Sequence, residues 1–290
     1  MSHTPALLTE TLYLLNPQEG DTVIDCTVGL GGHASALLER IGRKGKLIGL
    51  DADEENLQKA SALLERGPEG AESRGLSTAA LRQAQSSRSR RANNTVFLIR
   101  ANFRDLLSVL EDLRSTSGTD VRLCDILFAD LGLSSPHIDD PKKGFSFQAD
   151  GPLDMRFDRT QGQTAADLIA QSSEEDLARI LWEYGELKKA RPLARAIKAA
   201  APPQTTGDVV RIVEKESGHF AKKDLPKVFQ ALRIAVNDEM GALDALLEDG
   251  PGLLNAGGRM GVISYHSLED RKVKQRFREL TTAPKDAVTG

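Results

Sequence analysis

Residues 23–34 read VIDCTVGLGGHA, and this stretch decides the class of the fold. An apolar run that contains one acid, Asp25, is followed by three glycines, Gly29, Gly31 and Gly32. Such a pattern is typical of a short buried strand, a tight turn and the start of a helix. Glycines let the backbone approach a ligand closely, and the N–H groups at a helix start meet its polar atoms. The stretch therefore indicates a ligand site after the first strand of an α/β domain.

Outward from this stretch, buried strands alternate with helices along the chain. Strands are expected at 22–28, 46–50, 95–100, 125–131 and 259–265. Helices are expected at the N-terminus from Pro5, at 34–41, 54–66, 103–113 and 228–247, and beyond Ser267. Alternation of this kind predicts a parallel, doubly wound sheet.

Two stretches interrupt the alternation. Residues 67–94 are polar and rich in Ser, Gly, Ala and Arg, which predicts a flexible insertion, at most weakly helical, before the third strand. After Pro136 the pattern changes to helical segments, expected at 165–170, 174–182, 186–200 and 207–216. The sequence thus predicts a first part of the main domain at 1–138, a helical insertion at 139–224 and a second part at 225–290.

The charge balance argues against a protein coated in positive charge. The 290 residues include 38 basic and 42 acidic ones, a net charge of −4. RNA remains a candidate partner because the charge is unevenly spread. Five of the eight residues at 271–278 are basic, and a helical segment carries a second set, which we expect to contact phosphates: Lys188, Lys189, Arg191, Arg195 and Lys198.

Other classes of protein find little support in the sequence. No apolar run approaches the roughly 20 residues of a membrane helix, and the N-terminus lacks the features of a signal peptide. Cys26 and Cys124 are too few for a disulfide framework, and neither they nor His33 and His137 have partners at metal-ligand spacing. We therefore expect a cytoplasmic protein without a metal site.

An acid after the second strand strengthens the case for a cofactor. Asp51 ends that strand twenty residues after Gly31, where a carboxylate can accept hydrogen bonds from both ribose hydroxyls, although it could also cap the following helix. Gly29, Gly31 and Ala34 fit the pattern of a dinucleotide site, so a nicotinamide-dependent oxidoreductase stays open. The acid at Asp25 better suits the zwitterionic methionine end of S-adenosylmethionine.

The segment 130–136, DLGLSSP, lies at the carboxyl end of the fourth strand, beside the place where doubly wound sheets bind ligands. In an enzyme that methylates an amine, this edge must hold the planar amine against the methyl group. Asp130, Ser134 and Ser135 are the candidates for holding that amine and receiving its proton. A turn that merely ends the strand would also explain Gly, Ser and Pro here.

Several long strings occur together and in order along the chain. They are 29–33, 130–136, GFSFQADGPLDMR at 144–156, 184–186, FQALRIAVNDE at 229–239 and ISYHSLEDR at 263–271. Taken together they closely resemble the MraW/RsmH family of 16S ribosomal RNA cytosine-N(4) methyltransferases. The resemblance covers nearly the whole chain except 67–94 and the extreme C-terminus.

The resemblance implies a class I methyltransferase fold, Rossmann-like and doubly wound, with an inserted helical subdomain that recognises substrate. The implied cofactor is S-adenosyl-L-methionine. Cofactor-binding residues carry over to Gly31, Gly32, His33, Asp51, Phe103, Asp130 and His137, the last standing where the family usually has glutamine.

The implied activity is N(4)-methylation of a cytidine in small-subunit ribosomal RNA, within the assembled or nearly assembled subunit. A homodimer and DNA cytosine methylation stay open. Residues 223–228 depart from the family's His-Pro-Ala-Thr-Arg string, and family members usually continue beyond the point where this chain stops. These departures motivate the alternative of a non-catalytic ribosome-assembly factor that keeps the fold.

Overall fold

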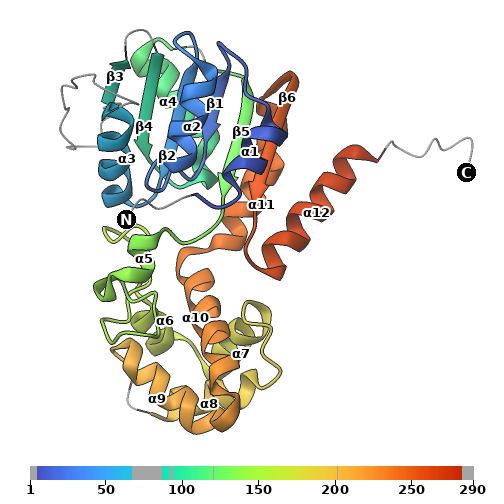
Figure 1. Ribbon diagram of the computed structural model, residues 1–290. Helices are drawn as coiled ribbons and strands as arrows, with labels where there is room; N and C mark the ends of the chain where they lie inside the picture. The colour runs from blue at the N-terminus through green and yellow to red at the C-terminus, as the bar shows by residue number, and fades with distance from the viewer. Residues whose placement is uncertain (1–4, 67–86, 92–93, 120, 201, 283–290) are drawn as a thin grey trace, which may run out of the picture. The chain divides into compact units, whose positions relative to one another are not determined.

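The computed structural model describes residues 5–66, 87–91, 94–119, 121–200 and 202–282, which divide into two compact units (Figure 1). The first unit comprises Met1–Gly132 and Gly241–Gly290, and the second comprises Leu133–Met240. The helical insertion predicted at 139–224 lies inside the second unit. Among the described helices, none is both long and apolar enough to cross a membrane.

A six-stranded sheet forms the centre of the first unit. Its strands are β1 (Thr22–Asp25), β2 (Lys46–Asp51), β3 (Ser87–Arg91), β4 (Asn94–Arg100), β5 (Cys124–Asp130) and β6 (Leu254–Ile263). They lie in the order β3-β4-β2-β1-β5-β6. All neighbouring pairs are parallel except β3 with β4. The predicted doubly wound parallel sheet is therefore confirmed.

Helices cover both faces of this sheet. The helical elements of the first unit are α1 (Leu8–Leu15), α2 (Gly32–Ile41), α3 (Glu54–Arg66), η1 (Phe103–Asp105), α4 (Leu106–Ser117), α11 (Glu239–Asp249), η4 (Gly250–Leu253) and α12 (Ser267–Thr281). The first two residues of α11 belong to the second unit. Val23 and Leu47 pack with α2 and α3 on one face, whereas the next residues, Ile24 and Ile48, pack with α4 and α11 on the other. Successive side chains of a strand point to opposite faces of the sheet. Neighbouring strand residues are therefore both apolar when helices cover both faces.

The edge strand β3 differs from the expectation for 67–94. The composition of that stretch predicts no strand, yet Ser87–Arg91 pairs antiparallel with β4, with Ser87 opposite Leu98. An alternating Ser-Arg sequence lacks the apolar periodicity by which a strand is recognised. It can still pair through its backbone with an otherwise open sheet edge. Residues 67–86 and 92–93 lie outside the described residues.

The second unit is helical. It contains α5 (Ser135–Asp139), η2 (Pro141–Lys143), α6 (Ala165–Gln171), α7 (Glu174–Glu183), α8 (Ala190–Ala199), α9 (Thr206–Ser217), η3 (Gly218–Phe220) and α10 (Ala221–Asn237). Thr164, Ser173 and Thr205 cap α6, α7 and α9, each accepting a hydrogen bond from a backbone N–H in the first turn. Apolar side chains from α6 to α10 form a core within this unit.

Two helices begin or end differently from the expectation. The helix expected at 228–247 is interrupted at Asp238, whose φ of +47° ends α10 before α11 begins. The side chain of Asn237 secures this end, because its amide donates to the Met155 carbonyl at 2.7 Å and its oxygen accepts from the Phe157 N–H at 2.9 Å. Likewise α8 starts at Ala190 rather than Glu186, which has a φ of +48°.

Gly144 provides a test of packing in the second unit. Its φ is +73°, and an added Cβ would meet the Pro152 carbonyl oxygen and lie 2.8 Å from the Asp154 nitrogen. Gly162 has a similar φ of +75° but nothing within 4 Å of such a Cβ. We expect Gly162→Ala to lose about 1 kcal/mol, from backbone conformation alone, and Gly144→Ala to lose at least about 2 kcal/mol more. Chemical denaturation of both variants measures the difference, and equal losses would contradict the described packing.

Candidate cofactor site

The cofactor-site residues that the sequence predicts in the first unit follow the carboxyl ends of adjacent strands. Parallel strands in the order β4-β2-β1-β5 end at the same edge of the sheet. The residues are Gly31, Gly32 and His33 after β1, Asp51 at the end of β2, Phe103 after β4 and Asp130 at the end of β5. This is the edge at which doubly wound sheets bind ligands.

The turn after β1 is held by the two neighbouring strands. The Cys26 N–H donates to the Phe128 carbonyl of β5, and the Val28 N–H donates to the Leu50 carbonyl of β2, at 2.8 and 2.9 Å. Gly31 has a φ of +87°, and a Cβ there would lie 3.2 Å from the Cα of Ala60. Only glycine combines this conformation with so close an approach of two backbones. The turn is therefore a narrow backbone cradle from which α2 begins at Gly32.

Asp51 ties the second strand to this cradle. One carboxylate oxygen accepts from the Gly29 N–H at 2.8 Å, and the other accepts from the Asp53 N–H, also at 2.8 Å. Capping of α3 falls instead to Asp53, whose carboxylate accepts from the Glu55 N–H at 2.9 Å. Since a carboxylate oxygen accepts more than one hydrogen bond, Asp51 can still bind hydroxyl groups.

Asp25 is the most unusual carboxylate of the site because it is fully buried. One oxygen accepts from the Thr27 N–H at 3.0 Å, whereas the other has no hydrogen-bond partner among the described residues. The pKa of Asp25 is raised to about 7, chiefly by burial and also by the charges of Asp130 and Asp51, against the effect of the Thr27 hydrogen bond. A buried, unpartnered carboxylate oxygen is a costly feature that a cationic or donating ligand group would satisfy.

Asp130 is fixed by groups from three parts of the first unit. Its N–H donates to the Thr27 hydroxyl at 2.6 Å, which ties the end of β5 to the turn after β1. The Tyr265 hydroxyl donates to one carboxylate oxygen at 2.8 Å. The other oxygen lies 3.5 Å from Nδ1 of His33. Asp130 thus has a defined orientation at the centre of the edge.

His33 bridges the N-terminal segment and Asp130. Its Nε2 lies 2.9 Å from the carbonyl oxygen of Ala6, and because a carbonyl can only accept, Nε2 is the donor. Burial lowers the pKa of His33, and the charge of Asp130 and the Ala6 hydrogen bond act in the opposite direction. The neutral ring therefore presents the lone pair of Nδ1 toward Asp130, and a proton there would join the two side chains.

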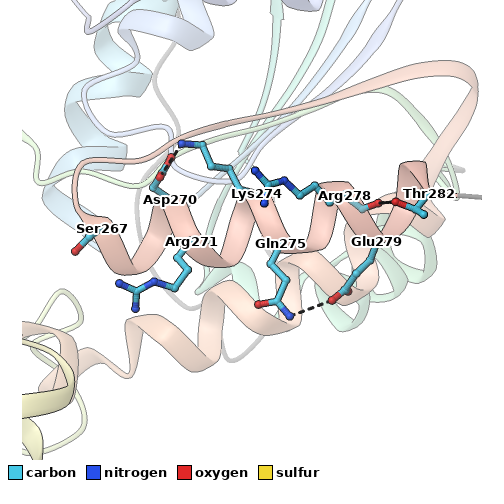
Figure 2. A pocket seen from close by; sticks show the side chains of 8 residues that line it. All are labelled: Ser267, Asp270, Arg271, Lys274, Gln275, Arg278, Glu279 and Thr282. Atoms are coloured by element: carbon cyan, nitrogen blue, oxygen red, sulfur yellow. Dashed lines mark hydrogen bonds and ion pairs between the residues drawn. The ribbon is translucent and has the colours of Figure 1, made fainter.

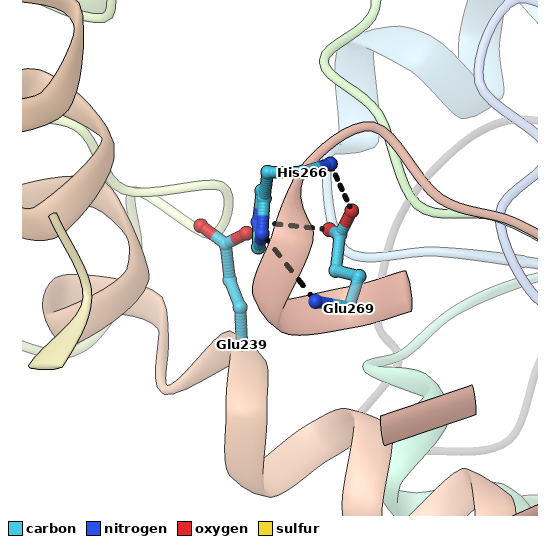
Figure 3. A group of neighbouring side chains, drawn as sticks. All are labelled: Glu239, His266 and Glu269. Atoms are coloured by element: carbon cyan, nitrogen blue, oxygen red, sulfur yellow. Dashed lines mark hydrogen bonds and ion pairs between the residues drawn. The ribbon is translucent and has the colours of Figure 1, made fainter. Parts of the chain in front are cut away.

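Tyr265 is a neighbour of Asp130 that the sequence analysis did not predict. A Cβ at Gly132 would lie 2.7 Å from the tyrosine ring, so only glycine leaves room for it. The buried Glu269 carboxylate accepts a hydrogen bond from the Tyr265 N–H at 2.8 Å. The same carboxylate lies 3.2 Å from Nε2 of His266 (Figure 3). These contacts hold the backbone from which Tyr265 reaches Asp130.

The remaining candidates belong to the second unit. Ser134 precedes α5, and its hydroxyl lies 3.0 Å from Nδ1 of His137. His137 is buried, with its ring centroid 5.0 Å from that of Phe145 and 5.2 Å from that of Phe157. Ser135 is the first residue of α5.

The basic run at 271–278 lies on α12, where a groove runs along the helix surface (Figure 2). Several of its charges are already paired. Lys274 contacts Asp270 at 2.9 Å, Lys272 contacts Asp244 at 2.6 Å, and Arg276 donates to the Leu247 carbonyl at 3.1 Å. The run therefore offers less free positive charge than its composition suggests.

The donor and acceptor set of the edge fits S-adenosylmethionine. Asp51 can accept from ribose hydroxyls, Phe103 after β4 offers an apolar face for adenine, and the acids Asp25 and Asp130 complement positive charge. Fold and site together fit a Rossmann-like domain for an adenosine-containing, cationic cofactor.

The chain belongs to the MraW methylase family, whose model matches residues 1–70 and 73–288. The resemblance drawn from the sequence is thus confirmed, and the chain is a methyltransferase whose cofactor is S-adenosylmethionine. Membership in a methylase family decides against the oxidoreductase alternative.

Three curated relatives share the name ribosomal RNA small subunit methyltransferase H. The chain is 43% identical to the protein of Anaeromyxobacter dehalogenans over 288 residues, covering 97% of this chain and 82% of that one. It is 41% identical to that of Symbiobacterium thermophilum, covering 95% and 79%, and 40% identical to that of Prosthecochloris aestuarii, covering 96% and 78%.

Similar solved structures include an S-adenosylmethionine-dependent O-methyltransferase from Thermotoga maritima, with 20% identity, a TM-score of 0.27, and 45% of this chain and 36% of that one covered. Fibrillarin from Aeropyrum pernix, solved with S-adenosylmethionine, matches with 18% identity, a TM-score of 0.26, and coverage of 44% and 38%. The family assignment does not depend on these partial matches.

The raised pKa of Asp25 makes the stability of the ligand-free protein depend on pH. Between the ordinary aspartate pKa of 3.8 and about 7, the folded chain holds a proton on Asp25 that the unfolded chain has lost. The contribution of this proton to the unfolding free energy is about 4 kcal/mol at most. It is complete below about pH 4 and is lost as the pH rises through 7. We expect Asp25→Asn to abolish this part of the pH dependence, measured as the unfolding free energy at acidic and alkaline pH.

The matched control is Asp105→Asn, which changes an exposed aspartate of the same unit. Its pH profile is expected to follow that of the wild type. If Asp25→Asn and Asp105→Asn gave the same profile as the wild type, the described environment of Asp25 would be wrong.

Proposed function

We propose that this protein transfers a methyl group from S-adenosylmethionine to N(4) of a cytidine in small-subunit ribosomal RNA. The observation that carries the proposal is Asp130, an oriented carboxylate at the carboxyl end of β5, in a chain of the MraW methylase family. The names of its relatives support small-subunit ribosomal RNA as the substrate. Cytidine N(4) as the acceptor rests on the resemblance of the sequence and on the chemistry of this carboxylate.

The acceptor amine determines what the protein residues must do. The lone pair of a cytidine N(4) is delocalised into the ring, which makes the nitrogen a poor nucleophile. When bound, S-adenosylmethionine supplies a methyl group attached to a positively charged sulfur. The sulfur is the leaving group and keeps the electron pair of that bond. Holding the amine in line with that methyl group contributes on the order of 7–11 kcal/mol. Alignment of the base is therefore the main task of the residues around Asp130.

Asp130 orients the amine by accepting a hydrogen bond from it. The Tyr265 hydroxyl fixes one carboxylate oxygen at 2.8 Å, which limits the rotation of the group and leaves the second oxygen able to accept from substrate. After transfer, the methylated nitrogen carries one proton more than the product needs, and Asp130 is the candidate to receive it. His33, at 3.5 Å from Asp130, can then share that proton.

The other proposed residues lie close to Asp130 along the chain. Ser134 and Ser135 follow it by four and five residues, and we propose that their hydroxyls or carbonyls bind the target base. His137 contacts Ser134 within the second unit and is proposed as a cofactor residue on the resemblance alone. A base must be unstacked to enter such a site, which favours a flexible segment of the RNA. A substrate in the assembled small subunit, a homodimer and a cytoplasmic location remain predictions.

Replacing Asp130 tests its role directly. Asp130→Ala removes the carboxylate that orients the amine, and we expect kcat to fall by about a hundredfold or more. The melting temperature should change little, because Asp130 lies at the end of its strand and is partly exposed. Methyl transfer from labelled cofactor, measured beside thermal unfolding, provides both values. Turnover near that of the wild type would disprove the assignment.

Tyr265→Phe tests the orientation of Asp130 without removing it. Loss of the phenol hydroxyl frees one carboxylate oxygen, and we expect kcat to fall by about tenfold with KM for RNA changed less, as for one lost hydrogen bond to a charged group. Tyr13→Phe is the matched control, because Tyr13 is 82% exposed. Equal kcat values for the two variants would show that the bond to Asp130 plays no part in turnover.

The function itself is tested on natural substrate. Purified protein and labelled S-adenosylmethionine are incubated with small ribosomal subunits from cells that lack the methylation, and the digested RNA is analysed for N(4)-methylcytidine. Label in that nucleoside is expected. Label in another nucleoside would refute the cytidine N(4) assignment, and cofactor binding without any label would favour the non-catalytic assembly factor.

A further inference from the structure

The basic residues at 188–198 differ in the contacts that they make within the protein. Arg195 contacts Glu174 at 3.2 Å, and Lys198 donates to the carbonyls of Ile169 and Ala170 at 2.9 and 3.2 Å. These two therefore stabilise the helices of the second unit. Lys188 and Lys189 are exposed, and within the described parts of the chain no ion pair joins either of them to an acid.

A second group of residues lies on α10 and the turn before it. Phe220 directly precedes α10 and has helical backbone angles, so Phe220, Lys223 and Lys227 follow one another at spacings of three and four residues. Residues at these spacings share one face of a helix. Phe220 is 51% exposed, and Lys223 is exposed as well. The N-terminal half of α10 thus presents an aromatic ring and two lysines in a row.

Direct contacts join these two groups into one surface. The ammonium of Lys189 lies 5.4 Å from the centroid of the Phe220 ring, within the range of a cation–π contact. The ammonium of Lys227 donates to the backbone carbonyl of Glu186 at 3.3 Å. We define the basic-aromatic patch as these five residues: Lys188, Lys189, Phe220, Lys223 and Lys227.

The composition of the patch indicates the chemistry of its partner. Lys188, Lys189 and Lys223 carry charge that no described acid neutralises by an ion pair, unlike the basic run on α12. The Phe220 side chain is half exposed among these lysines, so it is open to contact with a partner. Phosphates together with flat bases complement lysines together with a ring, and single-stranded nucleic acid supplies both.

We propose that the basic-aromatic patch binds a single-stranded segment of the RNA substrate, with its lysines on phosphates and Phe220 stacked on a base. This inference rests on the proposed function and deepens it, because it narrows the RNA contacts to these five residues and adds a stacking ring to them. A partner protein with an acidic surface is the competing occupant, and it would match the lysines but not the ring.

Three variants of the full-length protein test the patch. The first replaces Lys188, Lys189 and Lys223 with Gln, and the second is Phe220→Leu. The matched control replaces three other exposed lysines, Lys44, Lys59 and Lys215, with Gln and so removes the same charge. Binding of a fluorescein-labelled single-stranded RNA oligonucleotide is measured by anisotropy over a range of salt concentrations, with poly-glutamate as a second ligand.

The patch variant, with Gln at positions 188, 189 and 223, is expected to bind RNA about tenfold or more weakly. The slope of log K against log salt concentration should become shallower by about 2, because each lost phosphate contact accounts for about 0.7. Phe220→Leu should lose about tenfold, as for one stacked base, with the salt dependence unchanged. Equal weakening in patch variant and control would overturn the proposal, and so would wild-type affinity in the patch variant. Poly-glutamate binding as tight as RNA binding would assign the surface to an acidic protein instead.

Turnover separates failure of this inference from failure of the proposed function. With small ribosomal subunits as substrate, the patch variant should show a raised KM and an unchanged affinity for S-adenosylmethionine. If the wild type methylated no ribosomal RNA, the proposed function would fail first. If the wild type were active and the patch variant had an unchanged KM, only the patch would be wrong.

Discussion

The burial of one carboxylate beside two others is the constraint on which the account of this site depends. Asp25, Asp51 and Asp130 end the neighbouring parallel strands β1, β2 and β5, and burial, together with the charges of the other two acids, raises the pKa of Asp25. The protein stabilises two of the acids with donors, from backbone N–H groups for Asp51 and from Tyr265 for Asp130. Asp25 is instead left buried, and one of its oxygens has no hydrogen-bond partner in the part of the chain that the structure describes. We propose that a cationic cofactor satisfies this buried carboxylate.

The same constraint links the fold to the chemistry. Parallel strands bring their carboxyl ends to one edge, the glycine turn after β1 lets a ligand approach the backbone there, and Asp130 ends β5 at the same edge. The residues that hold Asp130 in place come from distant parts of the sequence. Glu269 holds the backbone at Tyr265, Tyr265 orients Asp130, and Thr27 fixes the end of β5. Loss of any of these should affect catalysis more than it affects folding.

How much could be predicted depended on whether the signal was local. The parallel strands and the residues at their carboxyl ends were predictable because apolar runs and acids are adjacent in sequence. The bond from Tyr265 to Asp130 was not, because it spans 135 residues and depends on the register of β5 with β6. Nor could β3 be found in a Ser-Arg sequence, or the break at Asp238 in a continuous helical pattern. The sequence also could not separate Lys198, which donates to the carbonyls of Ile169 and Ala170, from the exposed Lys188 and Lys189.

Proton release on cofactor binding tests the central claim most directly. S-adenosylmethionine is titrated calorimetrically into wild type and Asp25→Asn at about pH 6.5, in two buffers of different ionisation enthalpy. If Asp25 is protonated in the free protein and the cofactor favours its charged form, the wild type releases a large fraction of one proton more than the variant does. Equal proton release by the two proteins would contradict the account, because cofactor binding would then leave the protonation of Asp25 unchanged.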